Sequence, residues 1–193
     1  MRRAGVIIMT VAGELRTDRV ILRRWTAADR APFAALNRDP RVMEHFPAPL
    51  TAEQSHALAD QIDAHFTRHP FGLWALEIPG RTSFAGFVGL AVPGFQAHFT
   101  PCVEIGWRVA AEHWGFGYAT EAARAVLAFG FGHLRLGEIV SFTTAGNVRS
   151  RRVMERIGMT RSAADDFDHP RLPAGHPLRR HVLYRCRAHS SIV

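Results

Sequence analysis

The chain has 193 residues, of which 47% are hydrophobic and 21% are charged, and its formal net charge is +7. This length suits one domain, and this composition is typical of a globular protein. Because no apolar run approaches the ~20 residues of a membrane-spanning helix, the sequence excludes a transmembrane class. We expect one domain over residues 14–187, with flexible ends at 1–13 and 188–193.

The first residues imitate a signal peptide, since two arginines precede a short apolar run. No convincing cleavage site follows this run, so we expect a disordered or weakly docked extension, with Met9 as an alternative start. The two cysteines, Cys102 and Cys186, have no zinc-ligand spacing, and we expect free thiols in a cytoplasmic protein. The histidines likewise show no metal-binding spacing, so no metal is expected.

The positive charge is a weak indication of a nucleic-acid partner. All 24 Lys and Arg positions are Arg, and they are spread along the chain, as in a sequence with a biased coding composition. We therefore expect no specific nucleic acid as a partner. The arginines of the segment 149–156 are an exception, and they either bind a cofactor phosphate or form a solvated helix face.

Hydrophobic periodicity predicts the elements in chain order. Arg19–Trp25 alternates as a strand does, and Thr26 with Asp29 signals the start of a helix running to about residue 37. Thr51 and Gln54 form the start signal of a second helix. The remaining predicted elements are strands at 72–78, 84–92, 101–109, 137–144 and 181–187, a helix at 118–133, and a helix from a cap at Asn147 to Gly158.

The most informative segment is the glycine-bearing turn of residues 114–120, which follows a predicted strand and opens a predicted helix. Glycine lets the backbone approach a ligand closely, and the first N–H groups of a helix attract an anion such as a pyrophosphate. The dinucleotide fingerprint fails because its third glycine is absent. The P-loop fails because it needs a lysine and the chain has none.

This turn resembles the acetyl-CoA loop of the GNAT N-acetyltransferases, whose pattern is Q/R-x-x-G-x-G/A. Trp114 stands at the Q/R position, Gly117 at the first glycine and Ala119 at the last small residue. The tryptophan departs from the family pattern and is similar to the RimJ/RimL branch of ribosomal-protein acetyltransferases. Residues 147–159, with N-x-x-S before a helix and a Gly-Met exit, and residues 15–25 also resemble this branch.

The resemblance implies an α/β (α+β) GNAT fold, with a mixed, mostly antiparallel seven-stranded sheet and helices on both faces. It implies acetyl-CoA as cosubstrate, with Ser150 as the acid that protonates the leaving thiolate. The strand over 107–109 would pair with the pantetheine arm and splay from its neighbour. The expected cofactor-binding residues are Trp107, Arg108, Val109, Trp114, Gly115, Phe116, Gly117, Tyr118, Ala119, Thr120, Asn147 and Arg152. Asn147 and Ser150 have a purely capping role as the alternative.

The general base is less well defined by the sequence. Glu104 lies among apolar strand residues, which would raise the pKa of its carboxyl, but a hydrogen bond tying strands together is an equal alternative. The rival bases are His45, Glu77, His113, Asp165 and Asp166. For the acceptor pocket we expect His45, Phe46, Trp74 and Phe87 as walls, with core packing as the alternative for the aromatic residues.

The sequence therefore predicts an acetyl-CoA-dependent N-acetyltransferase that acts on a primary amine, either a protein N-terminus or a small molecule. It is expected to be a monomer or homodimer. A non-catalytic acyl-CoA-binding module is the alternative from another class, and a basic nucleic-acid-binding protein is a weaker one. The acceptor cannot be identified because acceptor loops have no readable code.

Overall fold

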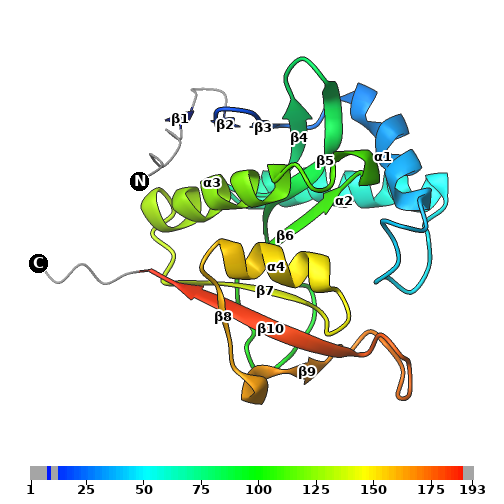
Figure 1. Cartoon of the computed structure of the whole chain (residues 1–193), viewed down its shortest axis with the longest axis vertical. Helices are drawn as coiled ribbons and strands as arrows, with labels where there is room; N and C mark the ends of the chain where they lie inside the picture. The colour runs from blue at the N-terminus through cyan, green and yellow to red at the C-terminus, as the bar shows by residue number, and fades with distance from the viewer. Residues whose placement is uncertain (1–7, 10–12, 189–193) are drawn as a thin grey trace, which may run out of the picture.

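The computed structural model of the chain describes residues 8–9 and 13–188 (Figure 1). In this part, the strands are β1 (Ile8–Met9), β2 (Leu15–Arg16), β3 (Ile21–Arg23), β4 (Leu73–Ile78), β5 (Thr82–Ala91), β6 (Glu104–Val109), β7 (Glu138–Thr144), β8 (Thr160–Arg161), β9 (Phe167–Asp168) and β10 (Arg180–Arg187). The helices are α1 (Arg30–Arg38), α2 (Ala52–Arg68), α3 (Tyr118–Gly132) and α4 (Val148–Arg156), with 3₁₀ turns at Ala27–Asp29, Ala111–His113 and Ala163–Asp165.

The strands form one sheet in the order β1-β2-β3-β4-β5-β6-β7-β10-β8, with β9 paired to β10. Every pairing is antiparallel except that of β6 with β7, which is parallel. This confirms the expected mixed, mostly antiparallel sheet. The described part has ten strands rather than the expected seven. Four of them, β1, β2, β8 and β9, contain only two residues each, which is too short for a visible alternation.

Helices cover both faces of the sheet, as expected. Trp74 and Leu76 of β4 pack in the cluster that contains the buried residues of α3 and Met154 of α4. Ala75, which points to the opposite face of the same strand, packs with the buried residues of α1 and α2, including Phe33. The alternation of β4 thus separates two apolar cores.

The ends of the chain lie partly beyond the described residues. Ile8–Met9 pairs with Leu15–Arg16, so this short part of the expected extension is in the sheet. Residues 1–7, 10–12 and 189–193, which belong to the expected flexible ends, lie outside the described residues. Ala188 donates its backbone N–H to Gly137 at 3.0 Å.

Both helix starts predicted in the first half of the chain are confirmed. Thr51 and Gln54 exchange hydrogen bonds at the start of α2: Gln54 N donates to Thr51 Oγ1 at 3.2 Å, and Thr51 N donates to Gln54 Oε1 at 2.9 Å. At the turn before α1, the backbone N–H of Thr26 donates to the Asp29 carboxylate at 2.7 Å. These bonds satisfy donors that a helix start leaves without intrahelical partners.

A buried ion pair joins this turn to the sheet. Nη1 and Nη2 of Arg23 donate to the two carboxylate oxygens of Asp29, each at 2.8 Å, and Nε donates to Glu77 at 2.9 Å. Only 2% of Asp29 is exposed. Burial raises the pKa of Asp29, but the hydrogen bonds and charge of Arg23, with the bond from Thr26, outweigh this effect and hold the pKa below its usual value.

We predict that Asp29→Asn lowers the free energy of unfolding by about 3 kcal/mol at pH 7, because it removes one partner of a buried pair. The stabilisation by Asp29 exists above its unfolded pKa of about 3.9 and is lost as the pH falls through its lower folded pKa. Urea unfolding at pH 7 and pH 3 should therefore show a difference from the wild type that shrinks in acid.

Asp60→Asn is the matched control, because Asp60 pairs with Arg30 at the surface and 65% of its side chain is exposed. An exposed pair contributes less than about 1 kcal/mol. Equal losses for the two variants would show that the Arg23–Asp29 pair does not fix the turn.

Candidate active site

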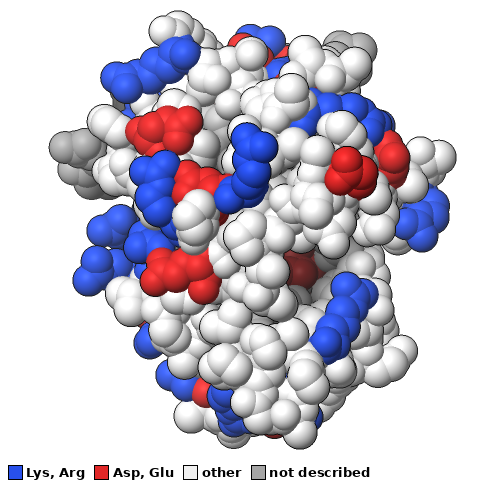
Figure 2. Space-filling model, turned by 90° about the vertical axis from the view of Figure 1, so that its right-hand side faces the viewer, with Lys and Arg blue, Asp and Glu red and all other residues white. Residues whose placement is uncertain are grey.

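A cavity of about 1010 Å³ opens where β6 and β7 part. The two strands pair only at Glu104 and Val140, where the Val140 N–H donates to the Val103 carbonyl at 2.9 Å. Beyond this point residues of both strands line the same cavity, so the strands splay as the sequence predicts. Figure 2 shows a hollow on this side of the molecule, with acidic surface at its base.

The edge of β6 that faces the cavity carries free backbone groups. Ala110 donates its N–H to Ala85 at 2.9 Å, which makes these two residues a hydrogen-bonded pair between the extended β5 and β6. Pairs alternate along an antiparallel ladder, so the N–H and C=O groups of Val109 and Trp107 point away from β5, into the gap. The Val109 carbonyl accepts from Trp114 Nε1 at 2.7 Å, and its N–H remains directed into the cavity.

The glycine turn leads from this edge into α3. Gly115 and Gly117 have φ angles of 83° and 84°, a left-handed conformation that side chains disfavour, and Gly117 is the N-cap of α3. Trp114, Gly115, Gly117, Tyr118, Ala119 and Thr120 line the cavity. The N–H groups of the first helical turn therefore offer an anion site there.

Phe116 is in the expected cofactor loop but does not line the cavity, so its part in cofactor binding stays a prediction. The residue is 49% exposed, its ring stacks on Tyr118, and the Arg81 guanidinium lies 5.4 Å above the ring. Its carbonyl accepts from Arg19, whose side chain also pairs with Glu121 in the first turn of α3. The left-handed glycines on both sides turn the Phe116 side chain outward.

Glu104 lies partly buried at the closed end of the gap and lines the cavity. No described residue donates a hydrogen bond to its carboxylate, so the expected alternative of a strand-tying bond is not supported. Burial raises the pKa of Glu104 to about 8, so the carboxyl is mostly protonated at neutral pH. Its ionised fraction grows as the pH rises, and this form is a stronger base than an ordinary carboxylate.

The start of α4 forms another wall. The Asn147 side chain caps the helix by accepting from Ser150 N at 3.1 Å, and its amide donates to Thr143 Oγ1 at 2.9 Å. Asn147 therefore has the capping role, and it also lines the cavity together with Ser150 and Arg152. The Ser150 hydroxyl takes no part in this cap and has no hydrogen-bond partner among the described residues.

The loop between α1 and α2 closes the other side of the cavity. His45 and Phe46 line it, and His45 Nδ1 lies 3.2 Å from Thr144 Oγ1. Trp74 does not reach the cavity: it is 2% exposed, packs edge-on against Phe129 in the core, and donates its Nε1–H to Gly13. Its position on β4 points to α3, so the expected role as a pocket wall is wrong.

Among the rival bases, His45 and His113 line the cavity. The three carboxylates among the rivals do not, and each pairs with an arginine elsewhere: Glu77 with Arg23, Asp165 with Arg185, and Asp166 with Arg161. Glu104 is therefore the one Asp or Glu among the described residues that line the cavity.

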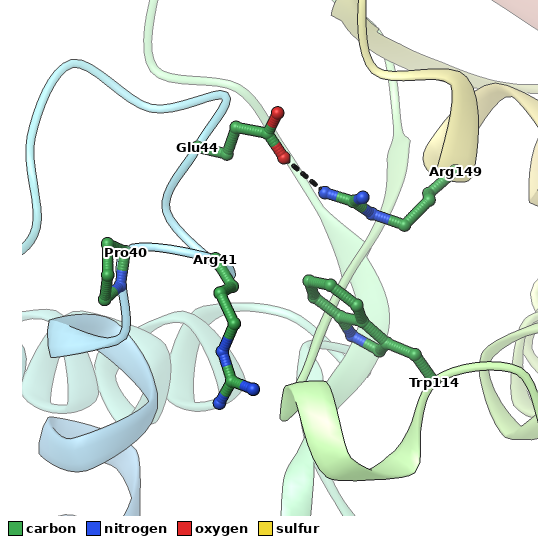
Figure 3. Close-up of a pocket in the computed structure, with 5 residues that line it drawn as sticks. All are labelled: Pro40, Arg41, Glu44, Trp114 and Arg149. Carbon is green, nitrogen blue, oxygen red and sulfur yellow. Dashed lines mark hydrogen bonds and ion pairs between the residues drawn. The ribbon is translucent and has the colours of Figure 1, made fainter.

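A smaller pocket of about 440 Å³ adjoins the main cavity at its mouth (Figure 3). Pro40, Arg41 and Glu44 approach from the loop between α1 and α2, and Trp114 and Arg149 approach from the opposite side (Figure 3). The Arg149 guanidinium lies 4.5 Å from the centre of the Trp114 ring and pairs with Glu44. This contact connects the loop to α4 beside the glycine turn.

Positive charge dominates the cavity wall, which carries Arg41, Arg108, Arg149, Arg152, Arg156 and Arg171. The sequence predicted Arg108 only through its backbone. It named the loop 165–169 as a source of alternative catalytic residues, but it assigned no role to Arg171, Leu172 and Leu178, which line the cavity together with His169. Their sequence pattern carries no signal for this position, because only the antiparallel β10 brings the segment back to the cavity.

In residues 8–9 and 13–188, no group of three His, Cys, Asp or Glu side chains could hold a metal ion. No helix of this part is both long and apolar enough to cross a membrane.

Comparison with known proteins assigns the family. The family profile described as "Acetyltransferase (GNAT) domain" matches residues 19–160. The uncharacterized protein YkkB of Bacillus subtilis is 35% identical over 152 residues, which cover 78% of this chain and 87% of YkkB. The FsC-acetyl coenzyme A-N(2)-transacetylase of Aspergillus fumigatus is 34% identical over 132 residues, or 65% of this chain and 55% of that protein.

A solved structure agrees with these sequence matches at the level of the fold. RimJ of Mycobacterium smegmatis, in complex with CoA-disulfide, superposes with a TM-score of 0.70 at 18% identity, covering 90% of this chain and 84% of RimJ. The parted strands, the glycine turn at a helix start and the matching profile lead to one conclusion. The chain belongs to the GNAT acetyltransferase family.

Proposed function

We propose that the protein transfers the acetyl group of acetyl-CoA to a primary amine by direct attack within one ternary complex. The observation that carries this proposal is a continuous path in the cavity, from the N-terminus of α3 along the open edge of β6 to Glu104. Such a path offers an anion site, a backbone edge and a proton acceptor in the order in which a CoA thioester and an amine would need them.

The residues at the cofactor end fit a CoA thioester. The first N–H groups of α3 would bind the pyrophosphate, and Arg152 would add positive charge. The free backbone groups of Trp107 and Val109 would pair with the pantetheine arm as an added strand does. One N–H group of this edge would then stabilise negative charge that develops on the thioester oxygen.

The proton transfers are assigned to Glu104 and Ser150. Glu104, directly or through a water molecule, takes the proton that the amine loses as its nitrogen bonds to the acetyl carbon. The bond between that carbon and sulfur then breaks, and the Ser150 hydroxyl protonates the departing sulfur. Ser150 regains a proton from water in the open cavity as Glu104 releases the one it took, so both side chains return to their starting states. The thiol pKa of about 8.5 makes sulfur a modest leaving group, so the acid accelerates the step without being indispensable.

The acceptor is either a protein N-terminal amine or the amine of a small molecule. The tryptophan at position 114 of the glycine turn and the N-x-x-S segment support membership of the RimJ/RimL branch, and with it a protein N-terminal amine as acceptor. The name of the Aspergillus relative supports a small-molecule amine. An α-amine of pKa about 7.7–8.0 is partly neutral near pH 7.4, whereas a lysine amine is only ~0.1% neutral, so an α-amine suits a weak base better.

We propose a cytoplasmic location, which the two free cysteines support.

Release of CoA from acetyl-CoA, followed with a thiol reagent across a panel of primary amines, tests this function. We expect amine-dependent release by the wild type. Gly117→Val should abolish it, because a β-branched residue at φ 84° strains the turn that presents the first N–H groups of α3 to the pyrophosphate. Calorimetry should show at least a tenfold loss of acetyl-CoA affinity.

Gly80→Val is the matched control, since Gly80 has a φ of 76°, has open space around it and lies away from the cavity. It should lose similar stability, about 1–2 kcal/mol, yet keep its acetyl-CoA affinity. Tight acetyl-CoA binding without turnover of any amine would favour the non-catalytic binding module instead.

Glu104→Gln should lower kcat/KM, and the ratio of wild-type to variant activity should grow as the pH rises from 6 to 9. Only the ionised carboxylate accepts a proton, and its pKa is about 8. Use of one amine for both proteins removes the titration of the amine from the ratio. A ratio that does not change with pH would exclude Glu104 as the base.

The same change should have the opposite pH trend in stability. Because folding raises the pKa of Glu104, the wild type loses stability as the pH rises from the unfolded pKa of about 4.3 to the folded pKa of about 8, and Glu104→Gln avoids this loss. The carboxyl keeps some contact with the open cavity, and solvent there reduces the destabilisation. We therefore expect Glu104→Gln to raise the free energy of unfolding at pH 9 by about 2 kcal/mol, which is less than the whole pKa shift would give. If the stability difference between wild type and Glu104→Gln changes with pH but the ratio of their activities does not, Glu104 is a buried acid without a role as the general base.

Ser150→Ala should reduce kcat roughly 10- to 100-fold while acetyl-CoA affinity and melting temperature stay near the wild-type values. The reason is that the Ser150 hydroxyl makes no bond in the helix cap. Ser150→Thr restores a hydroxyl and should recover part of the rate. A fall in melting temperature with unchanged kcat would assign Ser150 to the fold alone.

A further inference from the structure

The guanidinium of Arg108 lies in the cavity wall without a counter-ion. Among the described residues no carboxylate lies within ion-pair distance of it, and its buried Nε has no hydrogen-bond partner. One of its five N–H donors is used, because Nη1 donates to the Asn37 side-chain oxygen. Other sparsely exposed arginines are paired, such as Arg23 with Asp29 and Arg185 with Glu138.

Arg108 is held in place by a buried polar chain. The Asn37 amide donates to Ser55 Oγ at 3.2 Å, and the Ser55 hydroxyl donates to the Thr51 carbonyl at 2.8 Å. Asn37 and Ser55 are both fully buried. This chain orients the Asn37 oxygen toward Arg108, so the position of the guanidinium is fixed before any ligand arrives.

Aromatic and apolar groups surround the guanidinium on its other sides. It lies 4.2 Å from the ring centre of Phe46 and 5.5 Å from that of Phe87. Burial lowers the pKa of Arg108 to about 10, so the side chain remains charged at neutral pH. A buried cation without a partner is costly, and a bound anion would relieve that cost.

Its place on β6 relates Arg108 to the proposed base. Residues 104, 106 and 108 point to one face of the strand, and the Cα atoms of Glu104 and Arg108 are about 13 Å apart. Gly106 stands between them and lines the cavity without a side chain. The face thus carries a carboxyl at one end, a gap in the middle and a cation at the other end.

We propose that Arg108 binds a carboxylate on the acceptor, so that the substrate is a small amino acid or a derivative with a free carboxyl group. The inference rests on the proposed function, because it names the substrate class of the same site. A carboxylate matches the fork of a guanidinium with two parallel hydrogen bonds and carries the single negative charge that one arginine needs. Val42, Leu58, Leu73 and Phe87 line the same end and favour an apolar side chain.

Kinetics with matched acceptors test this assignment. CoA release is measured with leucine and phenylalanine, with their carboxamides, with their phosphonate analogues and with a short peptide. Each kcat/KM is divided by the fraction of neutral amine, since a carboxamide lowers the pKa of its α-amine. The wild type should prefer the carboxylate over the carboxamide at least ~30-fold, which is the range for loss of one partner of a buried charge pair.

Two variants alter the cation in different ways. Arg108→Gln removes the charge and should bring the carboxylate-to-carboxamide ratio close to one. Asn37→Asp keeps Arg108 but gives it an internal carboxylate, and the Ser55 hydroxyl can turn to donate to the new oxygen. This variant should melt at a higher temperature and also lose the preference. Arg38→Gln is the matched control, because it removes one charge from the exposed arginine next to Asn37 on α1. It should keep the preference for the carboxylate over the carboxamide.

The outcomes separate this inference from the proposed function. Two results overturn the carboxylate site while amine acetylation stands. One is that the carboxamide, the phosphonate or the peptide is turned over as fast as the amino acid. The other is that the preference for the carboxylate is unchanged in both Arg108→Gln and Asn37→Asp. Absence of release with every amine overturns the proposed function. Melting temperature and acetyl-CoA affinity of each variant show that the cofactor end is intact.

Discussion

The site depends on a single parallel contact between β6 and β7, at Glu104 and Val140. A strand inside a sheet normally has backbone partners on both edges, and buried backbone groups without partners are costly. Beyond Glu104, one edge of β6 loses its strand neighbour. The Trp114 indole satisfies the Val109 carbonyl there, and the other groups on that edge face the cavity. The place where the sheet opens is therefore also where a ligand can add to it.

The same opening accounts for the unusual electrostatics of the cavity. Burial moves the pKa of Glu104 up and that of Arg108 down, because each side chain lies on the inner face of β6 away from bulk water. Most other buried charges in the described chain are paired, as in the Arg23–Asp29 pair. Titratable groups with strongly shifted pKa values cluster at functional sites, and here two such groups lie on one strand and line one cavity.

The sequence predicted the glycine turn and the start of α4 because both depend on backbone geometry. A left-handed turn requires glycine at 115 and 117, and a helix start accepts few caps, so Asn147 was identifiable by its type and spacing. Side-chain direction was harder to predict. Phe116 lies within the same turn yet points outward, and Trp74 lies on a correctly predicted strand yet faces the core. The two-residue strands escaped prediction because alternation needs a longer run.

The acceptor end was not predictable for a different reason. Arg108 and Asn37 are 71 residues apart in the sequence, and neither belongs to a recognisable pattern. Their contact exists because α1 packs on the face of the sheet opposite α3, where it presents a buried asparagine to β6. A fold shared across a family thus supplies the strand opening and the glycine turn through the backbone, while side chains from distant helices meet only in the folded state. Substitutions at such contacts can therefore change the lining of the cavity without disturbing the strand opening.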